Sequence, residues 1–256
     1  MSERRFFIDQ PLTCADGART LVPLSDEDLH HATKVGRVRP GERVVVVAPD
    51  GRSWGIEITT VGSQGLEGVA SLRAPETGPP IDLVVFQGVP KGEKMDLVVR
   101  QCVEVGAREI VPVEMARTVV RLDDKKRRTR VERWRKIALA AAKQSGREAV
   151  PLVHDVCSVE GALDHIARLD RVFVLWEQCD SVLLSSAVRQ TVGAGARSVG
   201  IFVGPEGGLD PAEVTKLTQA GCLAVSLGPF ILRTETAAVA AAAITIAGAL
   251  DHVSHP

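Results

Sequence analysis

The chain has 256 residues, of which 45% are hydrophobic and 25% are charged, and these values are typical of a folded globular protein of one or two domains. Disorder over most of the length is thereby excluded. The formal net charge is only −1, so any binding of nucleic acid has to depend on local basic patches.

The first residues, MSERRFFIDQ, carry charges and lack a long apolar core, so we expect no signal peptide. The longest apolar stretch, residues 237–250, falls short of the roughly 18 residues that a bilayer span needs. We therefore expect a cytoplasmic protein with no membrane partner.

Cysteine and histidine spacing argues against a disulfide framework and a metal centre. The five cysteines form no CxxC pair and their number is odd, so we expect reduced thiols. The histidines at His30-His31, His154 and His252 lack a zinc spacing. The sequence therefore predicts that the protein holds no metal.

Residues 1–75 predict a small β-rich module with one helix. Strand-like segments lie at residues 5–9, 43–48, 54–61 and 69–72. Asp50 and Gly51, between the second and third segments, are a hairpin signal. Ser25 and the three acidic residues after it are typical of a helix start, which leads into LHHATKV.

Residues 73–80, RAPETGPP, concentrate Pro and Gly and predict a linker. After the linker, apolar strands alternate with helices, which is typical of a parallel sheet covered on both faces. The expected strands are residues 82–89, 109–114, 150–156, 171–178, 199–204 and 223–228. The expected helices are residues 94–105, 130–145, 159–169, 181–191, 211–220 and 236–250. The last helix is rich in Ala, which predicts close packing against its own domain or a second subunit.

The most informative stretch is VGIFVGPEGGLDPAE at residues 199–213. A buried strand ends in the glycine-rich loop GPEGG, after which Asp210, Pro211 and Glu213 form a typical helix start. Such a loop at the carboxyl end of a parallel strand either receives a ligand or makes a tight turn, and the pattern alone favours neither. The strings GxxxxGK[ST] and GxGxxG are absent, which argues against a P-loop nucleotide and against NAD.

Two further strand ends carry distinctive loops. Residues 171–178 finish in LWEQ, and residues 225–238, VSLGPFILRTETAA, place Arg233 and Glu235 before the Ala-rich helix. Arg233 suits contact with an anion or a nucleobase, whereas Thr-Glu suits a helix start. Because parallel strands end at one edge of a sheet, the three loops predict one pocket.

Taken together, FVGPEGGLDPAE and SLGPFILRTETA resemble the ribosomal RNA small subunit methyltransferase E family, within the SPOUT class of S-adenosylmethionine-dependent methyltransferases. HHATKVGRVRPGE, KGEKMDLVVRQCVEVGAREIVPV and RWRKIALAAAKQSGR follow in family order, so the resemblance covers nearly the whole chain. It implies an α/β fold: a PUA-like β-barrel RNA-binding domain at residues 1–75, then a SPOUT methyltransferase domain with a deep C-terminal trefoil knot at residues 81–256. It further implies a homodimer that uses S-adenosyl-L-methionine to methylate N3 of a uridine in 16S ribosomal RNA of the small ribosomal subunit.

The resemblance and the charges together nominate site residues. The implied cofactor-binding residues are Leu175, Gly204, Glu206, Gly207, Gly208, Leu227, Gly228 and Leu232. The candidates for RNA binding are the basic residues Lys34, Arg37, Arg39, Lys91, Lys94, Arg117 and Arg147. The N3 atom of uracil must lose a proton, so we expect a cation, Arg233, to stabilise the resulting charge. Glu235 is the candidate general base, with helix capping as its equally weighted alternative.

Two positions depart from the family pattern, since Phe230 stands where a basic residue is common and Lys143 where Glu is common. Neither change touches GPEGG or the RTE string. Two alternative functions stay open: a non-catalytic RNA-binding ribosome assembly factor, and a SPOUT methyltransferase that acts on a different RNA base. The sequence does not decide between naked RNA and an assembled subunit as the substrate.

Overall fold

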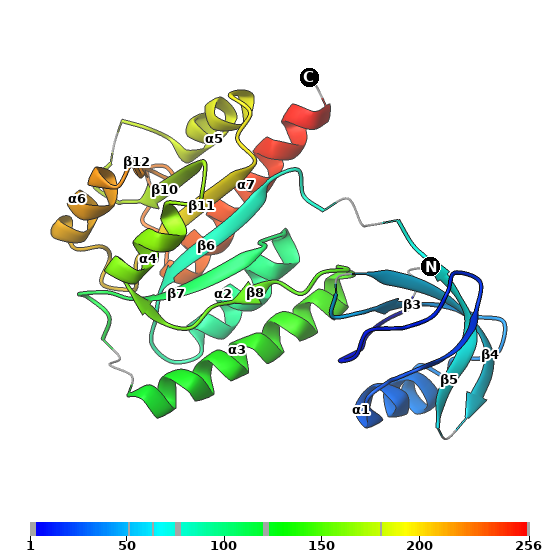
Figure 1. The fold of residues 1–256 in the computed structure, drawn as a ribbon. Helices are drawn as coiled ribbons and strands as arrows, with labels where there is room; N and C mark the ends of the chain where they lie inside the picture. The colour runs from blue at the N-terminus through cyan, green and yellow to red at the C-terminus, as the bar shows by residue number, and fades with distance from the viewer. Residues whose placement is uncertain are drawn as a thin grey trace. The chain divides into compact units, whose positions relative to one another are not determined.

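The computed structural model describes residues 4–50, 52–62, 64–74, 78–119, 123–179 and 181–254 (Figure 1). The chain divides into two compact units, and each is described by itself. Unit 1 comprises residues 1–77 and 142–149, and unit 2 comprises residues 78–141 and 150–256. The sequence pattern gave no sign that residues 142–149 group with the N-terminal part of the chain.

Unit 1 contains a five-stranded sheet in the order β1-β3-β4-β5-β2. Its strands are β1 (Arg4–Phe7), β2 (Arg19–Val22), β3 (Arg43–Val47), β4 (Ser53–Gly62) and β5 (Gly65–Leu72). β1 and β3 are parallel and the other neighbours are antiparallel, so the sheet is mixed. Val47 lies opposite Ser53, as the predicted hairpin requires, while Gly51 lies outside the described residues. Closure of this sheet into a barrel stays a prediction.

A short helical segment in unit 1 begins where the sequence predicts. The hydroxyl of Ser25 accepts a hydrogen bond from the Asp28 amide at 3.1 Å and caps α1 (Asp26–His30), which continues as the π-helical turn η1 (His31–Val35). Arg37 follows with φ of 49°, an uncommon backbone conformation for a residue with a side chain. The exposed basic side chains of this segment, named here the unit 1 basic set, are Lys34, Arg37 and Arg39.

Unit 2 is built on a parallel sheet in the order β12-β10-β11-β6-β7-β8, with β9 also paired to β7 (Figure 1). Its strands are β6 (Asp82–Gly88), β7 (Glu109–Glu114), β8 (Leu152–Val153), β9 (Cys157–Ser158), β10 (Arg171–Leu175), β11 (Ser198–Val203) and β12 (Leu223–Val225). Every pairing among them is parallel, which confirms the prediction from their continuous apolar runs. The strand predicted at residues 150–156 is too long, because only Leu152–Val153 (β8) of that stretch pairs with β7, and β9 (Cys157–Ser158) begins just beyond it.

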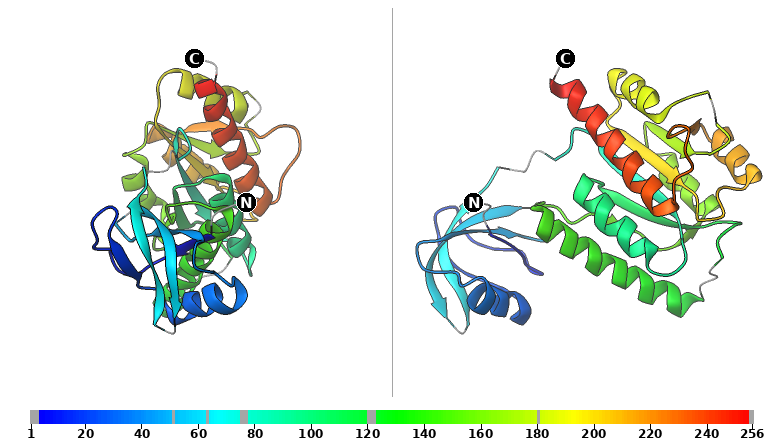
Figure 2. Two further views of the ribbon diagram at one scale, coloured as in Figure 1. Left: turned by 90° about the vertical axis from the view of Figure 1, so that its right-hand side faces the viewer. Right: turned by 180° about the vertical axis from the view of Figure 1, so that it is seen from behind.

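Helices cover both faces of this sheet (Figure 2). They are α2 (Lys94–Val105), α4 (Val159–Ile166), α5 (Leu184–Gly193), α6 (Pro211–Gln219) and α7 (Thr234–Ser254). The remaining long helix, α3 (Asp124–Ser145), has residues 124–141 in unit 2 and residues 142–145 in unit 1. α4 and α6 bury one face over Phe86 and Phe202, whose stacked rings lie 5.4 Å apart between centroids. α7 packs against α2 and α5 and against β6 and β11 on the other face.

The C-terminal helix α7 is longer than the apolar stretch from which it was predicted. By length and composition alone, the helical segment 234–252 could cross a membrane. The length of about 14 residues expected from the apolar stretch 237–250 was therefore too short. Ala238, Ala241 and Ala242 on this helix are buried inside unit 2. A Cβ atom on Gly248 would lie 2.8 Å from the Val188 side chain of α5, so the two helices approach closely. These contacts are those of a core helix and confirm the close packing that its Ala content predicts.

Candidate functional site

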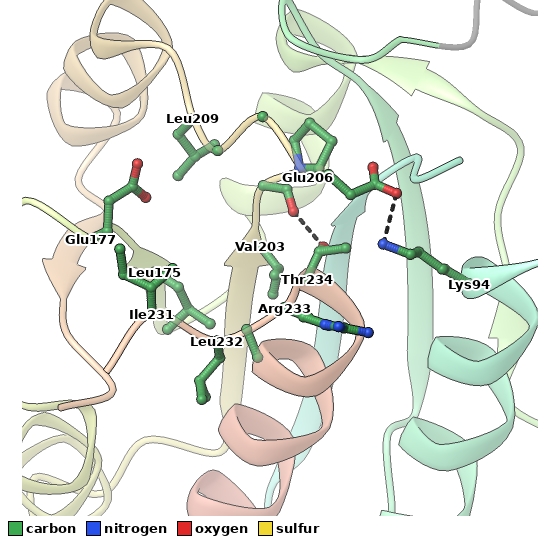
Figure 3. A pocket seen from close by; sticks show the side chains of 15 residues that line it. Lys94, Leu175, Glu177, Val203, Glu206, Leu209, Ile231, Leu232, Arg233 and Thr234 are labelled. Atoms are coloured by element: carbon green, nitrogen blue, oxygen red, sulfur yellow. Dashed lines mark hydrogen bonds and ion pairs between the residues drawn. The ribbon is translucent and has the colours of Figure 1, made fainter. Parts of the chain in front are cut away.

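A cavity of about 420 Å³ lies at the carboxyl ends of β10 and β11, beside the N-terminus of α7 (Figure 3). Most of its lining comes from the three loops singled out in the sequence, which follow β10, β11 and β12, and Lys94 of α2 adds to it. The lining residues are Lys94, Leu175, Glu177, Val203, Gly204, Pro205, Glu206, Gly207, Gly208, Leu209, Ile231, Leu232, Arg233, Thr234 and Ala237. The prediction that these loops form one pocket is confirmed.

The cavity has an apolar part between two charged sides. In Figure 3, the side chains of Leu175, Ile231 and Leu232 lie between Glu177 on one side and the pair Lys94 and Glu206 on the other. A second, smaller cavity of about 170 Å³ shares Leu175 and Leu232 and adds residues 225–230 to the lining. Such a pocket suits an elongated ligand with an apolar body and polar ends.

Two glycines of the GPEGG loop are required by the space around them. A Cβ atom on Gly204 would lie 2.9 Å from the backbone carbon of Gly208. Gly208 itself has φ of +71°, and a Cβ atom there would lie 2.9 Å from the carboxylate of Glu177. Gly207 differs, because a Cβ atom there would meet Arg117, 3.0 Å away, in the loop after β7.

The start of α7 is hydrogen-bonded to this loop. The buried Thr234 hydroxyl donates to the Gly204 carbonyl at 2.6 Å and accepts from the Gln87 side-chain amide at 2.8 Å. Gln87 is fully buried at the end of β6 and also donates to the Gly88 carbonyl at 2.8 Å. Three segments far apart in sequence are thus held together beneath the cavity.

A second set of contacts braces the loop from the side of β7. The Arg117 guanidinium donates to the Gly207 carbonyl at 3.1 Å and lies 3.6 Å from the Asp210 carboxylate. Asp210 caps α6 and Glu213 completes the capping box, as the sequence predicts. Glu213 also accepts a hydrogen bond from the Ala116 amide at 2.8 Å, so the helix start and the loop after β7 are joined.

One lysine connects the two acidic residues at the charged end of the cavity. Lys94 Nζ lies 3.1 Å from Glu206 Oε1 and 3.5 Å from Glu235 Oε2. The hydrogen bond from Lys94 to Glu206 raises the pKa of the ammonium above its ordinary value. Burial acts to raise the pKa of Glu206, but hydrogen bonds from backbone amides and from Lys94 outweigh it and hold that pKa below its ordinary value. Both groups are therefore charged at neutral pH.

The structure distributes the residues nominated from the sequence over three places. The main cavity contains Leu175, Gly204, Glu206, Gly207, Gly208, Leu232 and Arg233. Leu227 and Gly228 line the adjoining smaller cavity, and Glu235 contacts the main one through Lys94. Of the basic candidates, Lys94 and Arg117 lie at the main cavity or its loop, and the backbone amide of Lys91 donates to Glu206 at 3.1 Å. Arg147 and the unit 1 basic set belong to unit 1.

Sequence reasoning did not assign Gln87, Gly88 or Glu177 to the site. Gln87 is the one polar residue in the run LVVFQGV, and that position at a strand end was an available signal. A Cβ atom on Gly88 would lie 2.7 Å from the Pro205 nitrogen, so β6 and the GPEGG loop touch there. No pattern in the sequence brings those two segments together, because the contact depends on the strand order.

Comparison with known proteins agrees with this geometry. A family model of an RNA methyltransferase domain matches residues 77–246, and one of an RNA methyltransferase PUA domain matches residues 24–70. The ribosomal RNA small subunit methyltransferase E of Bacillus subtilis is 34% identical over 238 residues, which is 91% of this chain and 92% of that protein. The chain belongs to this family.

Two other members are similar over most of their length. The ribosomal RNA small subunit methyltransferase E of Mycobacterium tuberculosis is 35% identical and covers 92% of this chain and 88% of its own. A crystal structure of the member from Neisseria gonorrhoeae, bound to S-adenosyl methionine, has a TM-score of 0.77 at 28% identity and covers 94% of this chain and 95% of its own. Family membership makes this chain an S-adenosylmethionine-dependent RNA methyltransferase with a PUA domain, as the sequence resemblance implies.

Proposed function

We propose that this enzyme methylates N3 of a uridine in 16S ribosomal RNA of the small ribosomal subunit, in the cytoplasm. The family members from Bacillus subtilis and Mycobacterium tuberculosis are named ribosomal RNA small subunit methyltransferases. The observation that carries the proposal is the pocket of three loops, whose lining includes both the GPEGG loop and Arg233.

The residues at this pocket fit S-adenosyl-L-methionine. The apolar side chains of Leu175, Ile231 and Leu232 suit the adenine ring, and the close fit at Gly204 and Gly208 leaves backbone exposed to the ligand. Glu177 and Glu206 offer carboxylate oxygens at opposite sides for ribose hydroxyls and an ammonium group. When bound, the cofactor supplies a methyl group on a positively charged sulfur. We propose that Leu175, Gly204, Glu206, Gly207, Gly208, Leu227, Gly228 and Leu232 hold it.

Arg233 is proposed as the catalytic cation. The N3 atom of uracil must lose its proton before or during attack on the methyl group, and loss of the proton spreads negative charge to the carbonyl oxygens on either side of N3. Arg233 lines the cavity with its guanidinium exposed, so it can donate to a base edge and stabilise that charge. Glu235 lies in the first turn of α7 and faces Lys94, so a role as proton acceptor and a role in holding Lys94 both suit its position.

The finer features of the fold are part of the same proposal. We assign residues 1–75 to a PUA-like β-barrel and residues 81–256 to a SPOUT domain with a deep trefoil knot. The path of the chain supports the knot: β12 lies at the edge of the sheet, whereas Thr234 a few residues later bonds Gly204 and Gln87 near its centre. The segment between them must therefore return across the ends of β10 and β11.

We propose a homodimer with α7 at or near the interface. Phe230 and Ile231 beside the cavity are 80% and 88% exposed, and Leu250 on α7 is 50% exposed. Apolar side chains that are exposed next to a ligand pocket are typical of a surface covered by another chain. Phe230, which departs from the family pattern, suits such a contact better than a contact with phosphate.

For RNA, we propose two groups of basic residues. Lys91, Lys94 and Arg117 lie near the cavity in unit 2, where they suit the phosphates next to the target base. The unit 1 basic set and Arg147 supply the second group. Lys143, the other departure from the family pattern, forms an ion pair with Asp28 at 2.8 Å inside unit 1.

The test is nucleoside mass spectrometry of 16S ribosomal RNA from a deletion strain. N3-methyluridine should disappear on deletion and return with the parent gene. Arg233→Ala should lower the turnover of the purified enzyme by about 10²–10³-fold, the scale for one lost charge-stabilising donor, with RNA affinity little changed. Arg189→Ala, at an exposed arginine of α5, is the matched control. An unchanged N3-methyluridine level on deletion would refute the assigned product.

A further inference from the structure

Three side chains of the kinds that can bind a metal ion meet in unit 2, at the amino end of β7 and away from the cavity. Glu109 is the first residue of β7, His154 directly follows β8, and His165 lies in the last turn of α4. Glu109 pairs with Leu152 at the amino end of β7, whereas the cavity lies at the carboxyl ends of β10 and β11. The cluster is therefore separate from the site described above.

The three side chains already converge. Their candidate ligand atoms all lie within 4.8 Å of one another. His154 Nε2 is 2.7 Å from Glu109 Oε2, and the rings of His154 and His165 meet edge-on with centroids 4.6 Å apart. The side chains of His154 and Glu109 are 21% and 30% exposed, so the cluster is half-buried with one side open to solvent.

The donor set is one that Zn²⁺ prefers. Two imidazole nitrogens and one carboxylate oxygen form a common three-ligand zinc set, with bonds of about 2.0–2.2 Å. Tetrahedral angles at that bond length place the ligand atoms roughly 3.3 Å apart. The separation of 2.7 Å between His154 Nε2 and Glu109 Oε2 lies below this value, and all the ligand atoms lie within 4.8 Å of one another, so small side-chain rotations suffice. The open side would leave the fourth position to water.

We propose that Glu109, His154 and His165 form a binding site for one Zn²⁺ ion that joins β7, the segment after β8 and α4. The site is separate from the cavity and does not depend on the proposed methyl transfer. It departs from the absence of a metal that the sequence predicts, because the three ligands come from distant elements and no local spacing reveals them. The hydrogen bond between Glu109 and His154 would then be the metal-free form of the same cluster.

The test uses the full chain, without a histidine tag and after dialysis against a chelator. Titration with Zn²⁺ should give a stoichiometry of one, and Co²⁺ should give visible d–d absorption bands. His165→Ala and Glu109→Gln should each weaken Zn²⁺ binding by about 100-fold or more, since loss of an outer-shell partner alone costs about 10–100-fold. His252→Ala, at an exposed histidine of α7, should bind Zn²⁺ like the parent.

A second measurement avoids variants that fail to fold. In the unaltered protein, long-range ¹H–¹⁵N spectra of the imidazoles should show the nitrogens of His154 and His165 shifting on addition of Zn²⁺, while that of His252 does not. An absence of Zn²⁺ binding at micromolar concentration, or full binding by a folded His165→Ala protein, would overturn the proposal. The cluster would then be only a hydrogen-bonded contact between the two strands and α4.

Discussion

Replacing Gly204 with Ala tests how closely the cofactor loop is fitted. An added Cβ atom would lie 2.9 Å from the Gly208 carbon, 3.1 Å from the Leu209 nitrogen and 3.2 Å from Leu209 Cγ. Carbon atoms in contact normally keep about 3.5–4.0 Å, so the loop must open by roughly 0.5–1 Å. The Thr234 hydroxyl, which donates to the Gly204 carbonyl at 2.6 Å, opposes that movement.

The size of the effect follows from these distances. Overpacking of this kind costs about 1–3 kcal/mol. Every 1.4 kcal/mol is about tenfold in an equilibrium constant, so S-adenosylmethionine binding should weaken by roughly 5- to 100-fold if the opened loop has to close again on the ligand. A lower thermal unfolding midpoint should accompany this loss.

Isothermal titration calorimetry and thermal unfolding measure the two effects. Gly193→Ala is the matched control, because a Cβ atom there has nothing within 4 Å, and it should leave both values unchanged. If Gly204→Ala binds the cofactor like the parent, the loop either moves freely or lies outside the cofactor site, and the reasoning from its close fit is refuted.

Phe202→Ala should destabilise unit 2 by about 3–5 kcal/mol in chemical denaturation, because the ring is fully buried against Phe86; a cost below about 1 kcal/mol would contradict that packing. Replacing the unit 1 basic set with Ala should weaken RNA binding and flatten its salt dependence while cofactor affinity stays the same, and an unaltered salt slope would mean that these side chains do not meet phosphates. The lowered pKa of Glu206 should stabilise the fold above pH of about 4.5, and this contribution should be lost as the pH falls through the folded pKa, because the unfolded state binds the proton first. The difference in unfolding free energy between the parent and Glu206→Gln should therefore shrink on acidification, and a constant difference would contradict the pairing with Lys94.

The parallel sheet and its pocket could be predicted because their signals are local. Continuous apolar runs predicted the strands, and Asp210, Pro211 and Glu213 predicted the start of α6. Because parallel strands end at one edge of a sheet, the loops that follow three of these strands were expected to meet there. Contacts that depend on strand order, such as the hydrogen bond between Gln87 and Thr234, could not be predicted from the sequence. The same reason hid the meeting of His154 with Glu109, since neither lies near the other along the chain.

The sequence pattern gives no reason to distinguish the glycines of the GPEGG loop, whereas the structure shows that each is constrained by different neighbouring atoms. Gly204 is limited by the backbone of its own loop, and Gly208 by positive φ and by Glu177. Gly207 faces Arg117, so a substitution there acts on the loop after β7 before it acts on a ligand. These distinctions depend on distances of a few tenths of an ångström, which residue patterns do not carry.

The bond between Gln87 and Thr234 sets a time at which the pocket can first exist. The two residues are 147 positions apart, and the cavity has no complete wall until the start of α7 has joined β6 and the GPEGG loop. At a synthesis rate of roughly 5–20 residues per second, β6 waits about 7–30 s for that partner. During this interval the buried amide of Gln87 has no Thr234 to bond, and the nascent sheet cannot yet hold its ligand. The cofactor can therefore bind only after synthesis of the chain has reached α7 and this helix has packed against the sheet.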